Sequence, residues 1–228
     1  MTNKELVLDT ETCNIIKTDK VMPGNNLPYD IGFQLVEPST GNILLRRSYI
    51  VREIFFGEAE RMKSAYYADK LPRYYKDIAE GKRVIRSFFE IMNEISDICK
   101  REKVVAIVAH NARFDVDALN TCAWWLTGYH MKALPQDVEI WDTMKMWNAC
   151  KPAKYTAWCE ENGYKTKHTP PRDRMTAEII YRFLSGEIDF AESHTALEDV
   201  TIETEILLAC FKSHKAMAVE RVLYHARA

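Results

Sequence analysis

The stretch VVAIVAHNARFDVDAL, residues 104–119, changes its hydrophobic periodicity within a few residues. Val104–Ala109 is a short continuous apolar run, which is typical of a central strand buried on both faces. From residue 110 onward the apolar residues recur at helical spacing, with Asn111 as the expected N-cap. The inner face of this helix is expected to hold Phe114, Ala118, Cys122 and Leu126. A buried strand that leads directly into a helix predicts an α/β protein.

The rest of the chain also alternates between strand and helix patterns. Further strands are predicted over Glu5–Asp9, Tyr29–Glu37, Asn42–Val51 and Val138–Thr143. The turn sequence PSTGN joins the second and third of these as an antiparallel hairpin. Helical spacing covers residues 82–100, 58–79 with an interruption at LPRYY (71–75), and most of 143–228 outside loops 165–174 and 185–193. We expect a single domain over residues 1–228, with a central mixed five-stranded sheet flanked by helices.

Composition and charge narrow the class of protein. The chain has 228 residues, 47% of them hydrophobic, and a formal charge of −2, so it has no net basic attraction to nucleic acid or to an anionic membrane. A polyanionic partner must therefore be held by local charge or by metal. The six cysteines do not have zinc-site spacing and suit buried thiols. With neither a signal peptide nor a bilayer-spanning run, the sequence predicts a cytoplasmic protein that makes no membrane contact.

Four carboxylates and one histidine occur where a metal-dependent site would need them. Asp9 and Glu11 end the first strand, and Asp115 lies in the first turn of the helix after the buried strand. In SHTALEDV (193–200), Thr195 and Glu198 form a T-x-x-E capping box, so His194 precedes the last helix and Asp199 lies in its first turns. Like-charge pairs about 5 Å apart cost about 3 kcal/mol at an effective dielectric of about 20. Oxygen ligands favour two Mg²⁺ or Mn²⁺ ions.

As a set, these residues resemble the three motifs of the DEDDh group of 3′–5′ exonucleases, in the ribonuclease H-like superfamily. The matching segments are LVLDTET, AHNARFDVDAL and SHTALEDV, and the resemblance runs from about residue 5 to 212. It implies a ribonuclease H-like fold and a two-metal mechanism, with His194 as the general base. The sister group has a tyrosine where this chain has Thr195, which favours the histidine form. The implied metal ligands are Asp9, Glu11, Asp115 and Asp199.

Residues beside these motifs are assigned to substrate binding: Thr10, Thr12, Asn111 and Phe114. Two other groups have alternative interpretations. The cations of loop 165–174 could contact phosphate or could simply be solvated. Tyr66, Tyr67, Arg73, Tyr74 and Tyr75 could bind a single strand or could pack a helix. Asp142 is expected to cap the helix that follows it, and a short helix is expected over Lys215–His225.

The sequence thus predicts a metal-dependent 3′–5′ exonuclease that acts on the 3′ ends of DNA or RNA and releases nucleoside 5′-monophosphates. Single-stranded DNA is the favoured substrate, which suggests a role in replication or repair, and RNA trimming is the alternative. A different alternative is a non-catalytic module that docks on a polymerase or replication complex. Residues Thr12–Pro28, where the family has a short loop, form an insertion beside Glu11 that could shape the pocket for the 3′ end.

Overall fold

Among the residues that the structure describes, a mixed six-stranded sheet with β1 near its centre is the framework of the fold. The computed structural model describes residues 3–14, 24–63, 65, 68–213 and 222–224. The strand order is β4-β3-β2-β1-β5-β6. The antiparallel pairs are β1 with β2 and β2 with β3, and the parallel pairs are β3 with β4, β1 with β5 and β5 with β6. The strands are β1 (Glu5–Asn14), β2 (Asn26–Glu37), β3 (Asn42–Val51), β4 (Val84–Arg86), β5 (Ala106–Ala109) and β6 (Glu139–Asp142).

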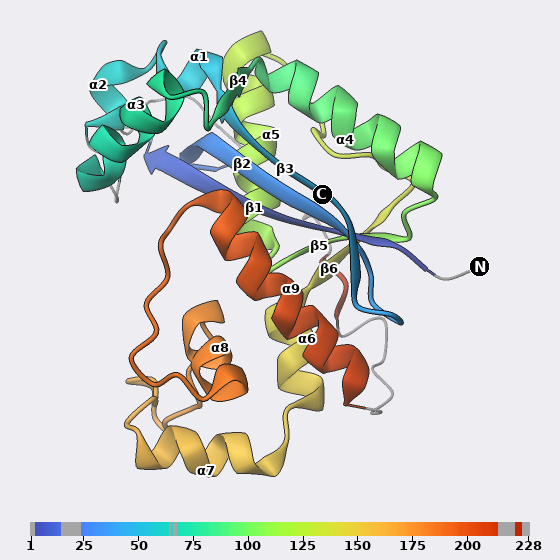
Figure 1. The fold of residues 1–228 in the computed structure, drawn as a ribbon, viewed down its shortest axis with the longest axis vertical. Helices are drawn as coiled ribbons and strands as arrows, with labels where there is room; N and C mark the ends of the chain where they lie inside the picture. The colour runs from blue at the N-terminus through green and yellow to red at the C-terminus, as the bar shows by residue number, and fades with distance from the viewer. Residues whose placement is uncertain (1–2, 15–23, 64, 66–67, 214–221, 225–228) are drawn as a thin grey trace.

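Helices cover both faces of this sheet, as Figure 1 shows. Their bounds are α1 (Arg52–Phe55), α2 (Ala59–Met62), α3 (Leu71–Ala79), α4 (Phe88–Glu102), α5 (Arg113–Thr127), α6 (Thr143–Cys150), α7 (Ala153–Glu161), α8 (Ala177–Ser185) and α9 (Ala196–Lys212). A 3₁₀ turn, η1 (Ala68–Lys70), precedes α3. None of the described helices is both long and apolar enough to cross a membrane.

Strand alternation divides the core into two layers. Leu6 and Leu8 of β1 pack with α4 and α5, whereas Val7 between them packs with α6, α8 and α9. In β5, Ile107 belongs to the first layer and Val108 to the second, which confirms the predicted strand buried on both faces. All six cysteines are buried thiols, as expected.

The expected five-stranded sheet has a sixth strand, β4, in the part of the chain that the structure describes. The apolar periodicity of residues 82–100 predicts that residues 84–86 belong to a helix, because Val84 fits that spacing. That assignment is wrong: Val84 is 50% exposed on an edge strand. Ser87 starts α4 instead, because its hydroxyl accepts the Glu90 N–H while the Glu90 carboxylate accepts the Ser87 N–H.

Two other local predictions need correction. LPRYY does not interrupt a helix but begins α3, where Pro72 in the first turn has no intrahelical N–H to lose. The Thr12–Pro28 insertion is in part an extension of the first hairpin, since Thr12 pairs with Pro28 and Asn14 with Asn26. The expected C-terminal helix over 215–225 falls almost entirely outside the described residues.

Candidate active site

Motif residues of β1 lie against the beginning of α9, and a glycine makes this approach possible. Asp9 pairs with Gly32 of β2. A Cβ at Gly32 would lie 2.5 Å from the Ala196 carbonyl carbon, which is far inside van der Waals contact. The absence of a side chain at this position therefore lets the N-terminus of α9 pack directly on the sheet. This packing brings the third motif to the first.

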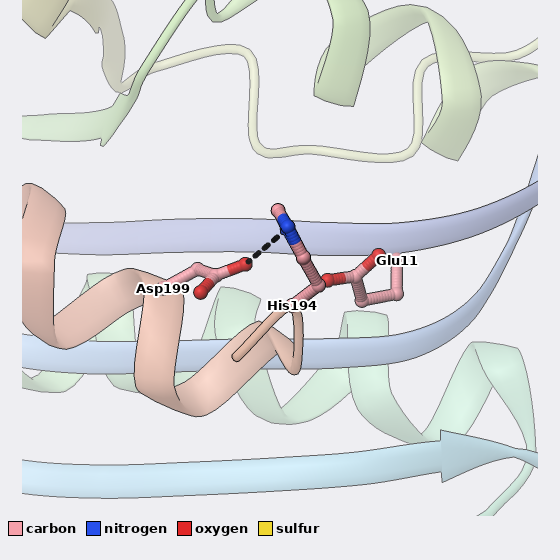
Figure 2. Close-up of side chains that lie close together, drawn as sticks. All are labelled: Glu11, His194 and Asp199. Carbon is pink, nitrogen blue, oxygen red and sulfur yellow. Dashed lines mark ion pairs between the residues drawn. The ribbon is translucent and has the colours of Figure 1, made fainter. Parts of the chain in front are cut away.

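Glu11, His194 and Asp199 come together at this junction. Each offers a ligand atom within 4.8 Å of the others, although Glu11 is on β1 and the other two are in the loop and first turns of α9. Figure 2 shows the His194 ring turned toward Asp199, with 4.0 Å between Nδ1 and Oδ2. His194 has a left-handed backbone with φ 52°, which is uncommon for a non-glycine residue. The structure therefore brings together three of the residues that the sequence assigned to one site.

Asp115 reaches the same region from the first turn of α5. Its Oδ1 accepts the Thr10 backbone N–H at 3.1 Å and the Thr10 hydroxyl at 2.8 Å, and its side chain is buried. Because Thr10 stands between Asp9 and Glu11 in the chain, these bonds hold Asp115 next to the first motif. Thr10, which we assigned to substrate binding, therefore orients a motif carboxylate.

Burial and the charges of neighbouring acids raise the pKa of each motif carboxyl. Burial is the largest cause throughout, and it raises the pKa of Glu11 and of Asp115 to about 7. For Asp199, burial followed by the charge of Glu11 raises the pKa to about 8. The pKa of Asp9 is also raised, by burial and then by Glu203, Asp115, Asp199 and Glu11. Ionisation of all four motif carboxyls is therefore unfavourable unless cations bind beside them.

A cavity of about 430 Å³ lies beside two of these acids. Asp9 and Asp199 line it together with two acids that lie outside the sequence predictions for the site, Glu192 and Glu203. Burial, followed by the charge of Asp199, raises the pKa of Glu192 to about 7, and its carboxylate lies 3.7 Å from His194 Nδ1. Glu203 could have been found from the sequence, because it is four residues after Asp199 on a predicted helix.

The donors in this cavity suit a hard divalent cation. Oδ1 of Asp199 and Oε2 of Glu203 are buried and have no hydrogen-bond partner among the described residues. Buried carboxylate oxygens are normally paired, so two such atoms at one cavity indicate a missing positive group. Oxygen-rich ligand sets favour Mg²⁺ or Mn²⁺.

A buried network supports the His194 loop from behind. Asp30 of β2 accepts hydrogen bonds from the Tyr74 hydroxyl at 2.8 Å, from Arg83 at 2.9 Å and from the Ala196 N–H at 3.3 Å. Lys70 of η1 donates to the Ser193 carbonyl. Tyr74 is fully buried, so of the two interpretations of the tyrosine-rich stretch, helix packing holds for this residue. Tyr66 and Tyr67 lie outside the described residues.

Helix caps at the site differ in part from the predictions. Thr195 is the N-cap residue of α9, but its hydroxyl donates to the Glu198 carboxylate and makes no cap bond to the backbone. Asn111 does not cap α5, because α5 begins after Ala112. Its backbone is left-handed, and its N–H donates to Asp142 Oδ1 at 3.2 Å. Asp142 also accepts the first N–H groups of α6, which confirms it as a cap.

The remaining substrate-binding candidates differ in how much of each side chain is exposed to solvent. Phe114 is 41% exposed, so its placement on the inner face of α5 was wrong. It lines a second cavity of about 260 Å³ with Asn111 and Asn26. Thr12 is half-buried in the extended hairpin. In loop 165–174, Lys165 pairs with Asp173 at 2.9 Å, whereas Arg174 lines the acidic cavity.

Comparison with known proteins identifies the fold. No family model and no curated protein matches the chain. The solved nuclease domain of 3′hExo, a DEDDh family member bound to rAMP, is 12% identical, with a TM-score of 0.62 over 99% of this chain and 98% of that chain. A 3′-exonuclease with its histone mRNA stem-loop is 12% identical, with a TM-score of 0.60 over 93% and 83% of the two chains.

A third match is E. coli Exonuclease I in complex with a 5cy-dT13 oligonucleotide, at 14% identity and a TM-score of 0.52. The alignment covers 93% of this chain but 41% of that chain, so this chain spans less than half the length of Exonuclease I. The chain therefore has the ribonuclease H-like fold of the DEDDh exonuclease domains. The expected fold class is confirmed.

Proposed function

We propose that the chain is a single-domain, divalent-metal-dependent 3′–5′ exonuclease that removes nucleoside 5′-monophosphates from single-stranded DNA. One observation carries the proposal: Glu11, His194 and Asp199 offer ligand atoms within 4.8 Å of one another, and Asp199 also lines the acidic cavity with Asp9. Asp9, Glu11, Asp115 and Asp199 would hold two Mg²⁺ or Mn²⁺ ions. When bound, such ions neutralise charge on the phosphate and activate water.

His194 has the properties of a general base. Burial, followed by the positive charge of Lys70, lowers the pKa of His194. The imidazole is therefore neutral near pH 7 and can accept a proton from the attacking water. Lys70 holds the Ser193 carbonyl next to it and so fixes the loop that carries the base. A base held in place before substrate binds loses less entropy in the reaction.

The second candidate function is 3′ trimming of RNA. Two of the solved structures support it: 3′hExo was crystallised with rAMP, and a 3′-exonuclease with a histone mRNA stem-loop. Exonuclease I with its oligonucleotide supports DNA instead. Discrimination depends on contacts near the 2′ position of the terminal ribose. The second cavity, with Phe114 and Asn111, is a candidate location for such contacts.

The test uses 5′-labelled single-stranded DNA and RNA of one sequence, each with an open and a blocked 3′ end, together with circular forms. We expect stepwise shortening of the open linear DNA with Mg²⁺ or Mn²⁺ and none with chelator. Faster shortening of RNA would favour the second candidate, and cutting of circles would contradict an exonuclease. No cleavage under any condition would favour a non-catalytic module that docks on a polymerase or replication complex.

The variant His194→Ala tests whether His194 is the general base. Turnover should fall by about 100-fold or more, as is common when a general base is removed. Metal binding should persist, because the four motif carboxylates remain. Cleavage by His194→Ala at the parent rate would remove His194 from the proposed mechanism while leaving the metal site untouched.

A further inference from the structure

Glu203 lies one turn after Asp199 on α9 and shares its orientation. Residues four apart are neighbours on one face of a helix. The side chain of Glu203 is 3% exposed, and it lines the same cavity as Asp9 and Asp199. Figure 1 shows α9 lying along the sheet beside β1, the strand that carries the first motif. The fold therefore brings Glu203 to the acidic cavity, although Glu203 belongs to none of the three sequence motifs.

The two oxygens of the Glu203 carboxylate have different surroundings. One accepts the backbone N–H of His110, at the turn between β5 and α5. The other, Oε2, is buried and has no hydrogen-bond partner among the described residues. The bond to His110 holds the carboxylate in place, so the unpaired oxygen has a defined position at the cavity.

The charged groups that act on Glu203 are negative. Asp115, Asp199 and Glu192 repel its ionised form, and Glu203 in turn is the neighbouring charge that acts most strongly on Asp9. A buried carboxylate in such surroundings needs either a proton or a cation. A cation at the cavity would give the unpaired Oε2 a partner.

We propose that Glu203 is a fifth carboxylate ligand of the divalent cation site, in addition to Asp9, Glu11, Asp115 and Asp199. This inference rests on the proposed metal-dependent function and extends it. The cations it would take are Mg²⁺ and Mn²⁺, which prefer oxygen donors. A further negative ligand strengthens cation binding in the absence of nucleic acid, since the chain itself then supplies more of the compensating charge.

The experiment is a calorimetric titration of the metal-free full chain with Mn²⁺, for the parent, Glu203→Gln and Glu205→Gln. Glu205 is an exposed carboxylate on the same helix and serves as the matched control. We expect Glu203→Gln to bind Mn²⁺ on the order of 10- to 100-fold more weakly, or to lose one ion, the range found when groups that support a metal site are removed. Glu205→Gln should bind Mn²⁺ like the parent.

Parent-like stoichiometry and affinity in Glu203→Gln would overturn the inference. If Glu203→Gln does not fold, Glu203→Asp replaces it in the same titration, because a carboxylate withdrawn by one methylene should also weaken binding. The outcome is independent of nuclease activity. A chain that binds Mn²⁺ through Glu203 but cleaves nothing contradicts the proposed function alone, whereas an active nuclease whose Mn²⁺ affinity ignores Glu203 contradicts this inference alone.

Discussion

Asp199→Asn should stabilise the metal-free protein although it removes a metal ligand. Ligand oxygens of Glu11 and Asp199 lie within 4.8 Å of each other. Two unit charges at that separation repel by about 3.5 kcal/mol at an effective dielectric of about 20. Asparagine has nearly the same shape and no charge, so it removes this repulsion without opening a cavity. We expect its free energy of unfolding to exceed that of the parent by up to about 3.5 kcal/mol at pH 8.

The sign of the pH dependence follows from the raised pKa values. Burial and the charge of Glu11 raise the pKa of Asp199 to about 8 in the folded state. A carboxyl of this kind favours folding while it is protonated. That contribution is fully present below its ordinary pKa near 4 and is lost as the pH rises toward 8. The metal-free parent should therefore lose stability between pH 5 and 8, and Asp199→Asn should lose less.

Urea unfolding in chelator, followed by tryptophan fluorescence, measures the difference at pH 5 and pH 8. Glu205→Gln, which removes an exposed carboxylate from α9, is the control and should change stability little. Added Mg²⁺ should stabilise the parent at pH 8 much more than Asp199→Asn. If Asp199→Asn were less stable than the parent at both pH values, the electrostatic reasoning behind the site would be refuted.

Two further predictions concern the supports of the site. Gly32→Ala places a Cβ 2.5 Å from the Ala196 carbonyl carbon. It should cost about 1–3 kcal/mol of stability in a urea titration, with a fall in Mn²⁺ affinity as α9 moves, and parent-like values would contradict the close approach. Burial acts to raise the pKa of Asp173, but bonds from Lys165, Lys151 and Thr156 prevail and lower it to about 2. Asp173→Asn should therefore cost about 2 kcal/mol at pH 7, and this loss should fade as the pH drops from about 4 through about 2. If thermal melts gave the same loss of stability at pH 7 and at about pH 2, the ion pairs of Asp173 would not be its cause.

Local patterns in the sequence were sufficient for most of the elements. The apolar run before His110 predicted β5, and the turn cluster after Glu37 predicted the hairpin of β2 and β3. Both depend on contacts between residues close in sequence or on a repeating periodicity. Val84 shows the limit of this approach: a residue can fit the periodicity of a neighbouring helix and still pair as an edge strand with β3. Strand pairing is a contact between distant segments, and its partner is not visible locally.

The sequence by itself determined the chemical character of the site. Asp9, Glu11, Asp115 and Asp199 with His194 indicated oxygen ligands and a titratable base, since residue type and motif order decide these properties. Only the tertiary structure decided how the residues are held and which others join them: Gly32 lets α9 reach the sheet, Thr10 orients Asp115, and Glu203 faces the cavity. The physical reason is that burial and unpaired oxygens are properties of packed surroundings, which segments far apart in the chain create together.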